Sequence, residues 1–274
     1  MRRVTPYVLM LSATLAASCA TSPTGRRQLD LVSDQQAAQA GNQSFQQIKK
    51  QTPVDNNPVD DSYAQCIVHA LSVATGAPRG GGNWIVTVFK DPKTVNAFAL
   101  PGGHVSVYTG IFSVAKTPGE LAAVLGHEMG HVQAGHGAER MSDQTATALG
   151  VDLAAILTGI DQSSVQGQAT MAALGAGAQV GVLLPFSRAQ ESEADKLGTQ
   201  FMAEAGFDPH EALELWRNMM SMDQSGAPPA ILSDHPADDT RLQALQAQMP
   251  DDVQRYQKAQ AQGRHPDCKA PAEG

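Results

Sequence analysis

The sequence predicts an α+β fold that is mostly helical and carries one small β-sheet. Two helix starts support the helical part, because residues 117–120 (TPGE) and 208–211 (DPHE) both combine a capping residue, proline and glutamate. The β part is confined to residues 84–110, where β-branched and aromatic residues are separated by glycine-rich turns. With 274 residues, 42% of them hydrophobic, the chain is long enough to bury its own core.

The segment before the β region predicts two helices. Residues 33–51 are rich in alanine and glutamine and are expected to be helical, and residues 51–61 (QTPVDNNPVDD) are expected to be a linker. Residues 62–76 predict an amphipathic helix that ends at Gly76. Its apolar face carries Tyr63, Ile67, Leu71 and Ala74.

Three short strands and two long helices follow. The strands are expected at residues 84–90, 95–100 and 104–110, with Pro-Gly-Gly as the turn between the last two. In the first long helix Thr117 is the N-cap, and the pattern predicts that the helix continues through residues 121–141. The second is expected at residues 210–222.

Two further regions have no clear motif. Residues 143–186 are rich in alanine, glycine and glutamine and predict buried or flexible helices. A membrane span is disfavoured there, because the apolar runs are short and Gln179 interrupts them. Residues 249–274 are expected to be a polar C-terminal tail, which leaves residues 33–248 as the folded domain.

The N-terminus reads as a secretory signal. Residues 1–18 start with two arginines, continue as an apolar and small-residue stretch, and are followed by Cys19. A cysteine at this place resembles the lipid-modified cysteine of bacterial lipoproteins, so residues 19–32 are expected to be a lipidated tether. Ala20 is not the aspartate that retains such lipoproteins in the inner membrane, which favours the outer membrane. The alternative is ordinary signal cleavage that leaves Cys19 unmodified.

Charge excludes one class of partner. The formal net charge is −8, and it becomes −10 when the signal is removed, because two arginines and no acidic residue are lost. No basic run is present, so nucleic-acid binding is not expected. An acidic body of this kind would be held at a membrane by acyl chains rather than by basic residues.

The other two cysteines leave two readings open. An even pair in an oxidising compartment makes a disulfide between Cys66 and Cys268 a candidate. In the other reading Cys66 is a small buried residue and Cys268 is a thiol in the tail. Spacing alone cannot decide between them.

Residues 127–131, HEMGH, are the strongest functional signal. His127 and His131 are four residues apart and so share one helical face, where both can offer a nitrogen to one metal ion. Glu128 lies beside that face and can reach a metal-bound water without ligating the metal. Gly126 and Gly130 weaken this helix, and we interpret them as places where a substrate-binding edge strand approaches the backbone.

A third ligand is expected from another helix. A histidine at position 137 would complete one known pattern, but that residue is glycine, and His136 is expected to point away from the ligand face. The acidic run at 187–195 supplies Glu191 as ligand, and Asp195 can orient a zinc histidine. Glu193 is expected to be exposed. Taken alone, this run also fits a charged helix surface.

The ordered motifs NAFALPGGHVSVYTG, ELAAVLGHEMGHV, SRAQESEADKLG and SDHPADDTRL resemble the zinc metallopeptidase family of the HtpX and CAAX-prenyl-protease type, and within it the periplasmic lipoproteins. The resemblance implies a zincin-like gluzincin fold and one zinc ion on His127, His131 and Glu191. It also implies Glu128 as the catalytic residue and Asp195 as a residue that assists it.

The expected function is therefore a zinc metalloendopeptidase, and the resemblance implies misfolded or stalled envelope proteins as substrates. The alternative is a lipoprotein chaperone or binding module with a structural zinc site. An open fourth metal position would argue against the alternative, because structural zinc sites are usually closed.

His235, in the sequence ILSDHPADDTR, is a further candidate. Local sequence alone favours a loop histidine next to a helix start, with its backbone restricted by Pro236. The family resemblance instead places this histidine near the metal. It would then be either a fourth ligand that restrains the enzyme or a hydrogen-bond donor to the oxyanion, and we favour the first role.

Overall fold

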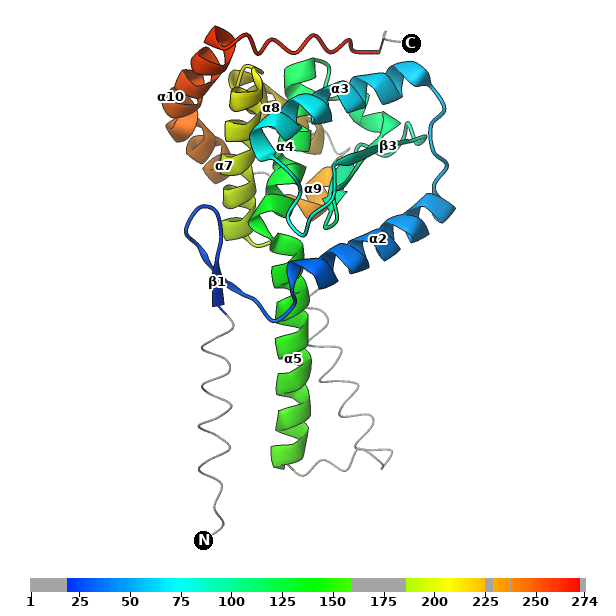
Figure 1. Ribbon diagram of the computed structural model, residues 1–274, viewed down its shortest axis with the longest axis vertical. Helices are drawn as coiled ribbons and strands as arrows, with labels where there is room; N and C mark the ends of the chain where they lie inside the picture. Colours follow the sequence, from blue (N-terminus) through cyan, green and yellow to red (C-terminus); the bar gives the residue numbers. More distant parts are fainter. Residues whose placement is uncertain (1–18, 159–185, 225–228, 237, 272–274) are drawn as a thin grey trace. The chain divides into compact units, whose positions relative to one another are not determined.

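The structure is a computed structural model that describes residues 19–158, 186–224, 229–236 and 238–271 (Figure 1). The chain divides into two compact units, one formed by residues 1–33 with 137–184 and the other by residues 34–136 with 185–274.

The first unit contains a β-hairpin and a long helix. Strands β1 (Cys19–Thr21) and β2 (Arg27–Leu29) pair in antiparallel orientation, and α5 spans His136–Thr158. The Arg26 guanidinium donates two hydrogen bonds, of 2.6 and 2.7 Å, to the carboxylate of Glu139 on α5. Residues 19–32 were expected to be a lipidated tether, and this hairpin lies within that segment.

The second unit is mostly helical, as the sequence predicts, and carries the sheet. Its helices are α2 Asp34–Gln51, α3 Pro58–Thr75, α4 Pro118–Ala134, α7 Arg188–Ala205, α8 His210–Gln224, α9 Ile231–Asp234 and α10 Asp239–Ala261.

Two boundaries differ from the expected ones for local reasons. Helix α3 begins at Pro58, inside the expected linker, because the Asn57 side chain accepts a hydrogen bond from the Val59 N–H and proline fits the first helical position. Helix α10 continues through Pro250 to Ala261, so half of the expected C-terminal tail is helical. The tail was expected because this segment is polar, yet Met249, Asp252 and Ala259 of the helix are buried.

The three predicted strands form one sheet in the order β3 (Ile85–Phe89), β5 (His104–Tyr108), β4 (Ala97–Leu100). Strand β5 is parallel to β3 and antiparallel to β4, and a 3-10 helix, η1 (Thr109–Ser113), follows it. In this sheet β4 is an edge strand, and it lies beside α4.

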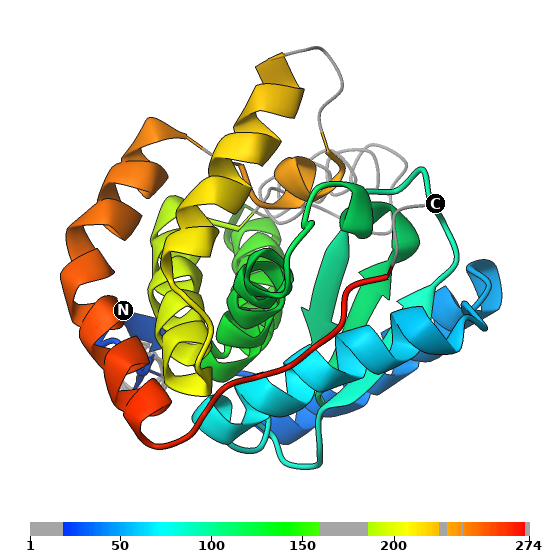
Figure 2. The ribbon, with the colours of Figure 1, turned by 90° about the horizontal axis from the view of Figure 1, so that it is seen from above.

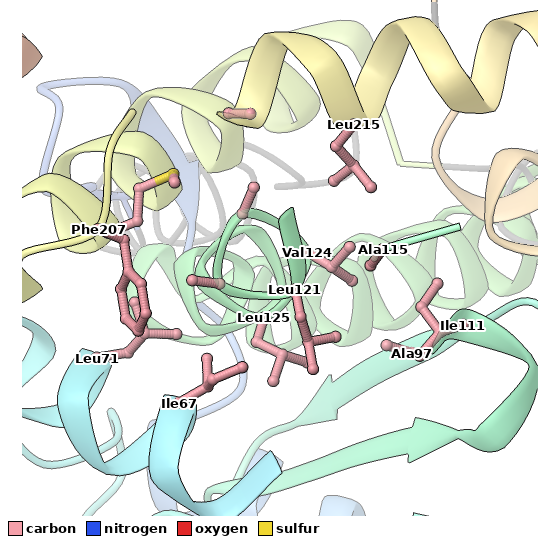
Figure 3. Packing of buried hydrophobic residues seen from close by; sticks show 14 of the residues in the cluster. Ile67, Leu71, Ala97, Ile111, Ala115, Leu121, Val124, Leu125, Phe207 and Leu215 are labelled. Carbon is pink, nitrogen blue, oxygen red and sulfur yellow. The ribbon is translucent and has the colours of Figure 1, made fainter. Parts of the chain in front are cut away.

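Helix α4 occupies the centre of the second unit. It packs against α3, α7, α8 and the sheet, and Figure 2 shows it enclosed between these elements. In Figure 3, Leu121 and Leu125 of α4 lie toward Ile67 of α3, and Leu215 of α8 covers the opposite side. Because α4 is buried along almost its whole length, any polar side chain on it faces an environment with little water.

Helix α4 begins as predicted but ends earlier. Thr117 and Glu120 form the capping box, with Pro118 at the first position. Gly135 ends the helix in the left-handed conformation, with φ 75°, and a Cβ there would lie 2.1 Å from the Arg79 guanidinium. The single helix expected over residues 121–141 is therefore two helices, α4 and α5.

The structure joins Cys66 on α3 to Cys268 in a disulfide bridge. The bridge ties the segment after α10 to the core, in which Cys268 is buried. No helix among the described residues has the length and apolarity needed to cross a membrane. Residues 143–158 of the alanine-rich stretch belong to α5, and residues 159–185 lie outside the described residues.

Candidate metal centre

Helix α4 holds His127 and His131 one turn apart, with both rings buried. Their Nε2 atoms are 3.1 Å apart. The spacing therefore directs both nitrogens to one point, as the sequence predicts.

Helix α7 brings Glu191 to the same point. The helix begins with a capping box formed by Ser187 and Gln190, which places Glu191 in its first turn. The Glu191 oxygens lie 3.5 Å from the Nε2 atoms of His127 and His131, and only 2% of this residue is exposed.

His235, which directly follows α9, completes the group. Its Nδ1 atom is 2.9 Å from a Glu191 oxygen and 3.2 Å from His127 Nε2. One ligand atom from each of these four buried residues lies within 4.8 Å of the others, so they could hold one metal ion. His235 is thus close enough to act as a fourth donor at this point.

The donor set fits zinc. Three imidazole nitrogens that face one another in a buried site repel through their lone pairs unless a cation lies among them. Four tetrahedral ligands at zinc–nitrogen distances of about 2.0–2.1 Å would be about 3.3 Å apart, close to the observed 3.1 and 3.2 Å. Burial also holds the pKa of His131 well below its usual value, which keeps this ring neutral.

Glu191 has the charge state of a ligand. Burial alone would raise the pKa of its carboxyl, but hydrogen bonds from His131 and His235 and the charge of nearby histidines hold that pKa below its usual value. An ionised carboxylate with two neutral imidazoles is the His₂Glu set of catalytic zinc sites.

Glu128 lies beside this group but is not part of it. One of its carboxylate oxygens accepts a hydrogen bond of 3.3 Å from the N–H of Ala99 on β4, and the other is 3.5 Å from His235 Nε2. Burial raises the pKa of Glu128, and His235 and His127 offset part of that rise. Glu128 thus stands between the candidate metal position and the edge strand.

Asp195 is one turn beyond Glu191 on α7 and lies behind His127. Its Oδ1 atom is 3.0 Å from His127 Nδ1, so His127 can donate that proton and present Nε2 to a metal. Burial would raise the pKa of Asp195, but the charge and hydrogen bonds of Arg241 hold it below its usual value.

Arg241 is a residue of this site that the sequence did not reveal. Its guanidinium donates to both Asp195 oxygens at 2.7 and 2.8 Å, lies 3.0 Å from Glu191, and packs 4.1 Å from the centre of the Trp216 ring. It also donates to the backbone carbonyls of His235 and Pro236. The sequence holds one indication of this role. Arg241 lies in the first turn of α10, where a positive charge interacts unfavourably with the helix dipole unless acidic groups offset it.

Two expectations about neighbouring residues were wrong. His136 does not point away from the ligand face: it is fully buried, and its Nδ1 atom is 2.8 Å from Nδ1 of His131. Glu193 is not exposed, because 4% of it is accessible and it lies 3.2 Å from His136. The first error follows from extending α4 past Gly135 as a regular helix, and the second from taking the face of α7 that carries Glu193 to be a solvent face.

The glycines of α4 also have a different partner from the expected strand. A Cβ on Gly126 would lie 2.9 Å from the carbonyl oxygen of Gly198, and one on Gly130 would lie 3.0 Å from that of Ala194. Both neighbours are on α7. The glycines therefore let the two ligand-bearing helices approach closely. Cys19 lies at the start of β1 and is exposed.

The chain matches one family model and several individual proteins. The model of "Peptidase family M48" matches residues 58–249. Mitochondrial metalloendopeptidase OMA1 of Schizosaccharomyces pombe is 40% identical over 169 residues, which cover 61% of this chain and 47% of that protein. The beta-barrel assembly-enhancing protease of Escherichia coli (strain K12) is 31% identical over 211 residues, which cover 76% of this chain and 42% of the relative.

The chain thus spans less than half the length of these two relatives. The family model nevertheless covers most of the chain, including all four residues of the candidate metal group. One of these relatives is named as a metalloendopeptidase and the other as a protease. The chain belongs to peptidase family M48.

Proposed function

We propose that this chain is a zinc-dependent endopeptidase that acts on misfolded or stalled proteins of the bacterial envelope. One observation carries the proposal: His127, His131 and Glu191 converge on one point, and the buried carboxylate of Glu128 lies beside that point without joining the group. A structural zinc site has no need of such a carboxylate.

The edge strand β4 supplies a place for substrate. An extended peptide can add to a sheet edge through backbone hydrogen bonds. The Ala99 N–H of β4 already points toward Glu128, so a peptide on this edge would pass next to that carboxylate.

In the proposed reaction Glu128 moves the proton. It accepts a proton from the attacking water and later donates it to the leaving amine, and its raised pKa suits both steps. Zinc, when held by His127, His131 and Glu191, acts as a Lewis acid and lowers the pKa of a water molecule. Asp195 holds His127 in the tautomer that such a ligand needs.

A structural zinc site in a chaperone is the second candidate, and His235 favours it. With His235 the group has four protein donors, which is typical of closed structural sites. The two functions differ in what happens when the His235 loop moves. In a peptidase the loop leaves and substrate enters, whereas in a chaperone the site stays closed.

The substrate class can be tested by trapping. Glu128→Gln should bind clients without cleaving them, so envelope proteins recovered with it should be enriched over those recovered with wild type. Glu191→Ala, which should lack the metal, is the matched control. Equal recovery with both variants and with wild type would favour the chaperone.

We propose the periplasmic face of the outer membrane as the location, through acylation of Cys19. One relative is named as mitochondrial and the name of the other gives no compartment, so the proposal depends on the signal-like residues 1–18 and on the exposed Cys19. A fatty-acid analogue should label wild type and should not label Cys19→Ser. Equal labelling of the two proteins would refute the anchor.

A further inference from the structure

A second buried histidine and glutamate stand behind His131. His136 Nδ1 is 2.8 Å from His131 Nδ1, and His136 Nε2 is 3.2 Å from Glu193 Oε2. His136 has no exposed surface and Glu193 is 4% exposed. We infer that His136 and Glu193 form a positioning relay that fixes the tautomer of His131, so that its Nε2 atom presents a lone pair to the metal.

The relay lies at the break between helices α4 and α5. Gly135 adopts φ 75°, which turns the chain after α4 and returns the first residue of α5 to the His131 ring. Any other residue at position 135 would be strained and would meet the Arg79 guanidinium. Helix α7 supplies Glu193 two residues after the ligand Glu191.

The direction of the hydrogen bonds follows from the carboxylate. An ionised carboxylate only accepts, so His136 must donate from Nε2 to Glu193. A neutral imidazole has one N–H, so His136 Nδ1 is then an acceptor. His131 must therefore donate from Nδ1, which leaves its Nε2 unprotonated. The opposite order would place the proton of His131 on Nε2, where it would block the metal.

The two histidine ligands are thus oriented by different means. His127 donates directly to Asp195, which also accepts hydrogen bonds from the Arg241 guanidinium. His131 reaches its carboxylate through a second imidazole. Both arrangements leave Nε2 free on the same side of α4, where these two atoms are 3.1 Å apart.

The relay can be tested without peptidase activity, although it depends on the proposed metal centre. Nitrogen-15 NMR of histidine side chains in metal-free wild type distinguishes the two tautomers. The inference requires the His131 proton on Nδ1 and the His136 proton on Nε2. Finding the His131 proton on Nε2 would overturn it.

Zinc affinity, measured by competition with a chelator, gives the second test. Glu193→Leu removes the acceptor and should weaken zinc binding by about 10- to 100-fold, the usual effect of losing such a partner. Glu193→Gln should recover most of that loss, because its amide oxygen can still accept from His136. A purely structural role would make the two variants equal, and zinc binding by Glu193→Leu as tight as wild type would also contradict the relay.

His104→Phe is the matched control. His104 on β5 is also buried, donates a hydrogen bond of 2.7 Å from Nε2 to Asn42 Oδ1, and stacks on Phe45. It has no described contact with the metal group, so zinc affinity should stay at the wild-type value. Thermal unfolding of each metal-free variant shows whether it is folded, and the tautomer measurement on wild type decides the question if a variant is not.

Discussion

Glu128 and Glu191 are buried carboxyl groups next to the same histidines, yet their pKa values shift in opposite directions. Burial dominates for Glu128 and raises its pKa. For Glu191 the hydrogen bonds from His131 and His235 outweigh burial and lower it. Glu191 therefore remains charged, as a metal ligand would be, while Glu128 is the more easily protonated of the two carboxylates.

This difference predicts that Glu191→Ala loses the metal rather than only the activity. Removing one of three zinc ligands leaves two imidazoles and His235, and the charge that stabilises the cation is lost. Elemental analysis of purified protein should find well under one zinc per chain. Stoichiometric zinc in Glu191→Ala would show that the third ligand is a different residue.

At the residue scale, the sequence predicted those site residues that lie in short repeating patterns. The spacing of four between His127 and His131 defines a helical face without knowledge of the fold. Arg241 could not be found in this way, because its partners Asp195 and Trp216 come from two other helices. The role of a residue that connects distant elements depends on packing, which no local pattern encodes.

At the scale of elements, the site depends on how closely α4 approaches α7. Gly126 and Gly130 on α4 and Gly198 on α7 form this contact, and a Cβ on Gly198 would lie 2.7 Å from the backbone nitrogen of His127. The sequence indicated that the backbone of α4 is approached closely. It could not indicate that the approaching element is a helix, because glycine permits contact with either.

Gly198→Ala should therefore separate the two ligand-bearing helices. We expect a net loss of about 1–3 kcal/mol in the free energy of unfolding, because overpacking outweighs the better helix propensity of alanine. Zinc affinity should fall as well. Denaturant unfolding and chelator competition measure the two effects.

Gly150→Ala on α5 is the control, because no described atom lies within 4 Å of its Cβ position. It should be neutral or stabilising by up to about 1 kcal/mol. A similar effect of both substitutions would show that helix propensity, and not the contact between α4 and α7, is being measured.

In the proposed function, the loop that carries His235 controls the access of substrate to the metal site. His235 occupies the fourth donor position, and Arg241 holds the carbonyl groups of His235 and Pro236. If the closed state predominates by about nine to one, His235→Ala should raise cleavage of a flexible substrate about tenfold at saturating zinc. Steady-state kinetics on casein-derived peptides measure this change.

Ser233→Ala, an exposed change two residues earlier, should leave the rate unaltered. A large fall in kcat for His235→Ala with zinc retained would instead assign His235 to the oxyanion. An unchanged rate would mean that His235 has neither role.

Within the second unit, a disulfide links Cys66 to Cys268, which are 202 residues apart in sequence. A link across so long a loop restricts the unfolded chain strongly. The Cys66→Ser, Cys268→Ser double variant should lose about 2–5 kcal/mol in the free energy of unfolding. Cys19→Ser is the control and should unfold like wild type. Equal stability of all three proteins would contradict a structural role for the bridge.

At the scale of the molecule, composition and helix signals were enough to predict a mostly helical chain with one small sheet. The order of the strands was not predictable, because it depends on pairing between segments and not on the segments themselves. The pairing of the cysteines was open for the same reason. The hairpin at residues 19–32 was missed because its strands have three residues each, too few to show alternation.

The central claim is that Glu128 performs the chemistry at a metal that it does not bind. The most direct test measures zinc content and cleavage together in Glu128→Gln. The account predicts one zinc per chain, an unchanged fold, and a rate of peptide cleavage lower than that of wild type by roughly 10²- to 10⁴-fold. Undiminished cleavage by Glu128→Gln with zinc bound, or loss of the zinc itself, would contradict it.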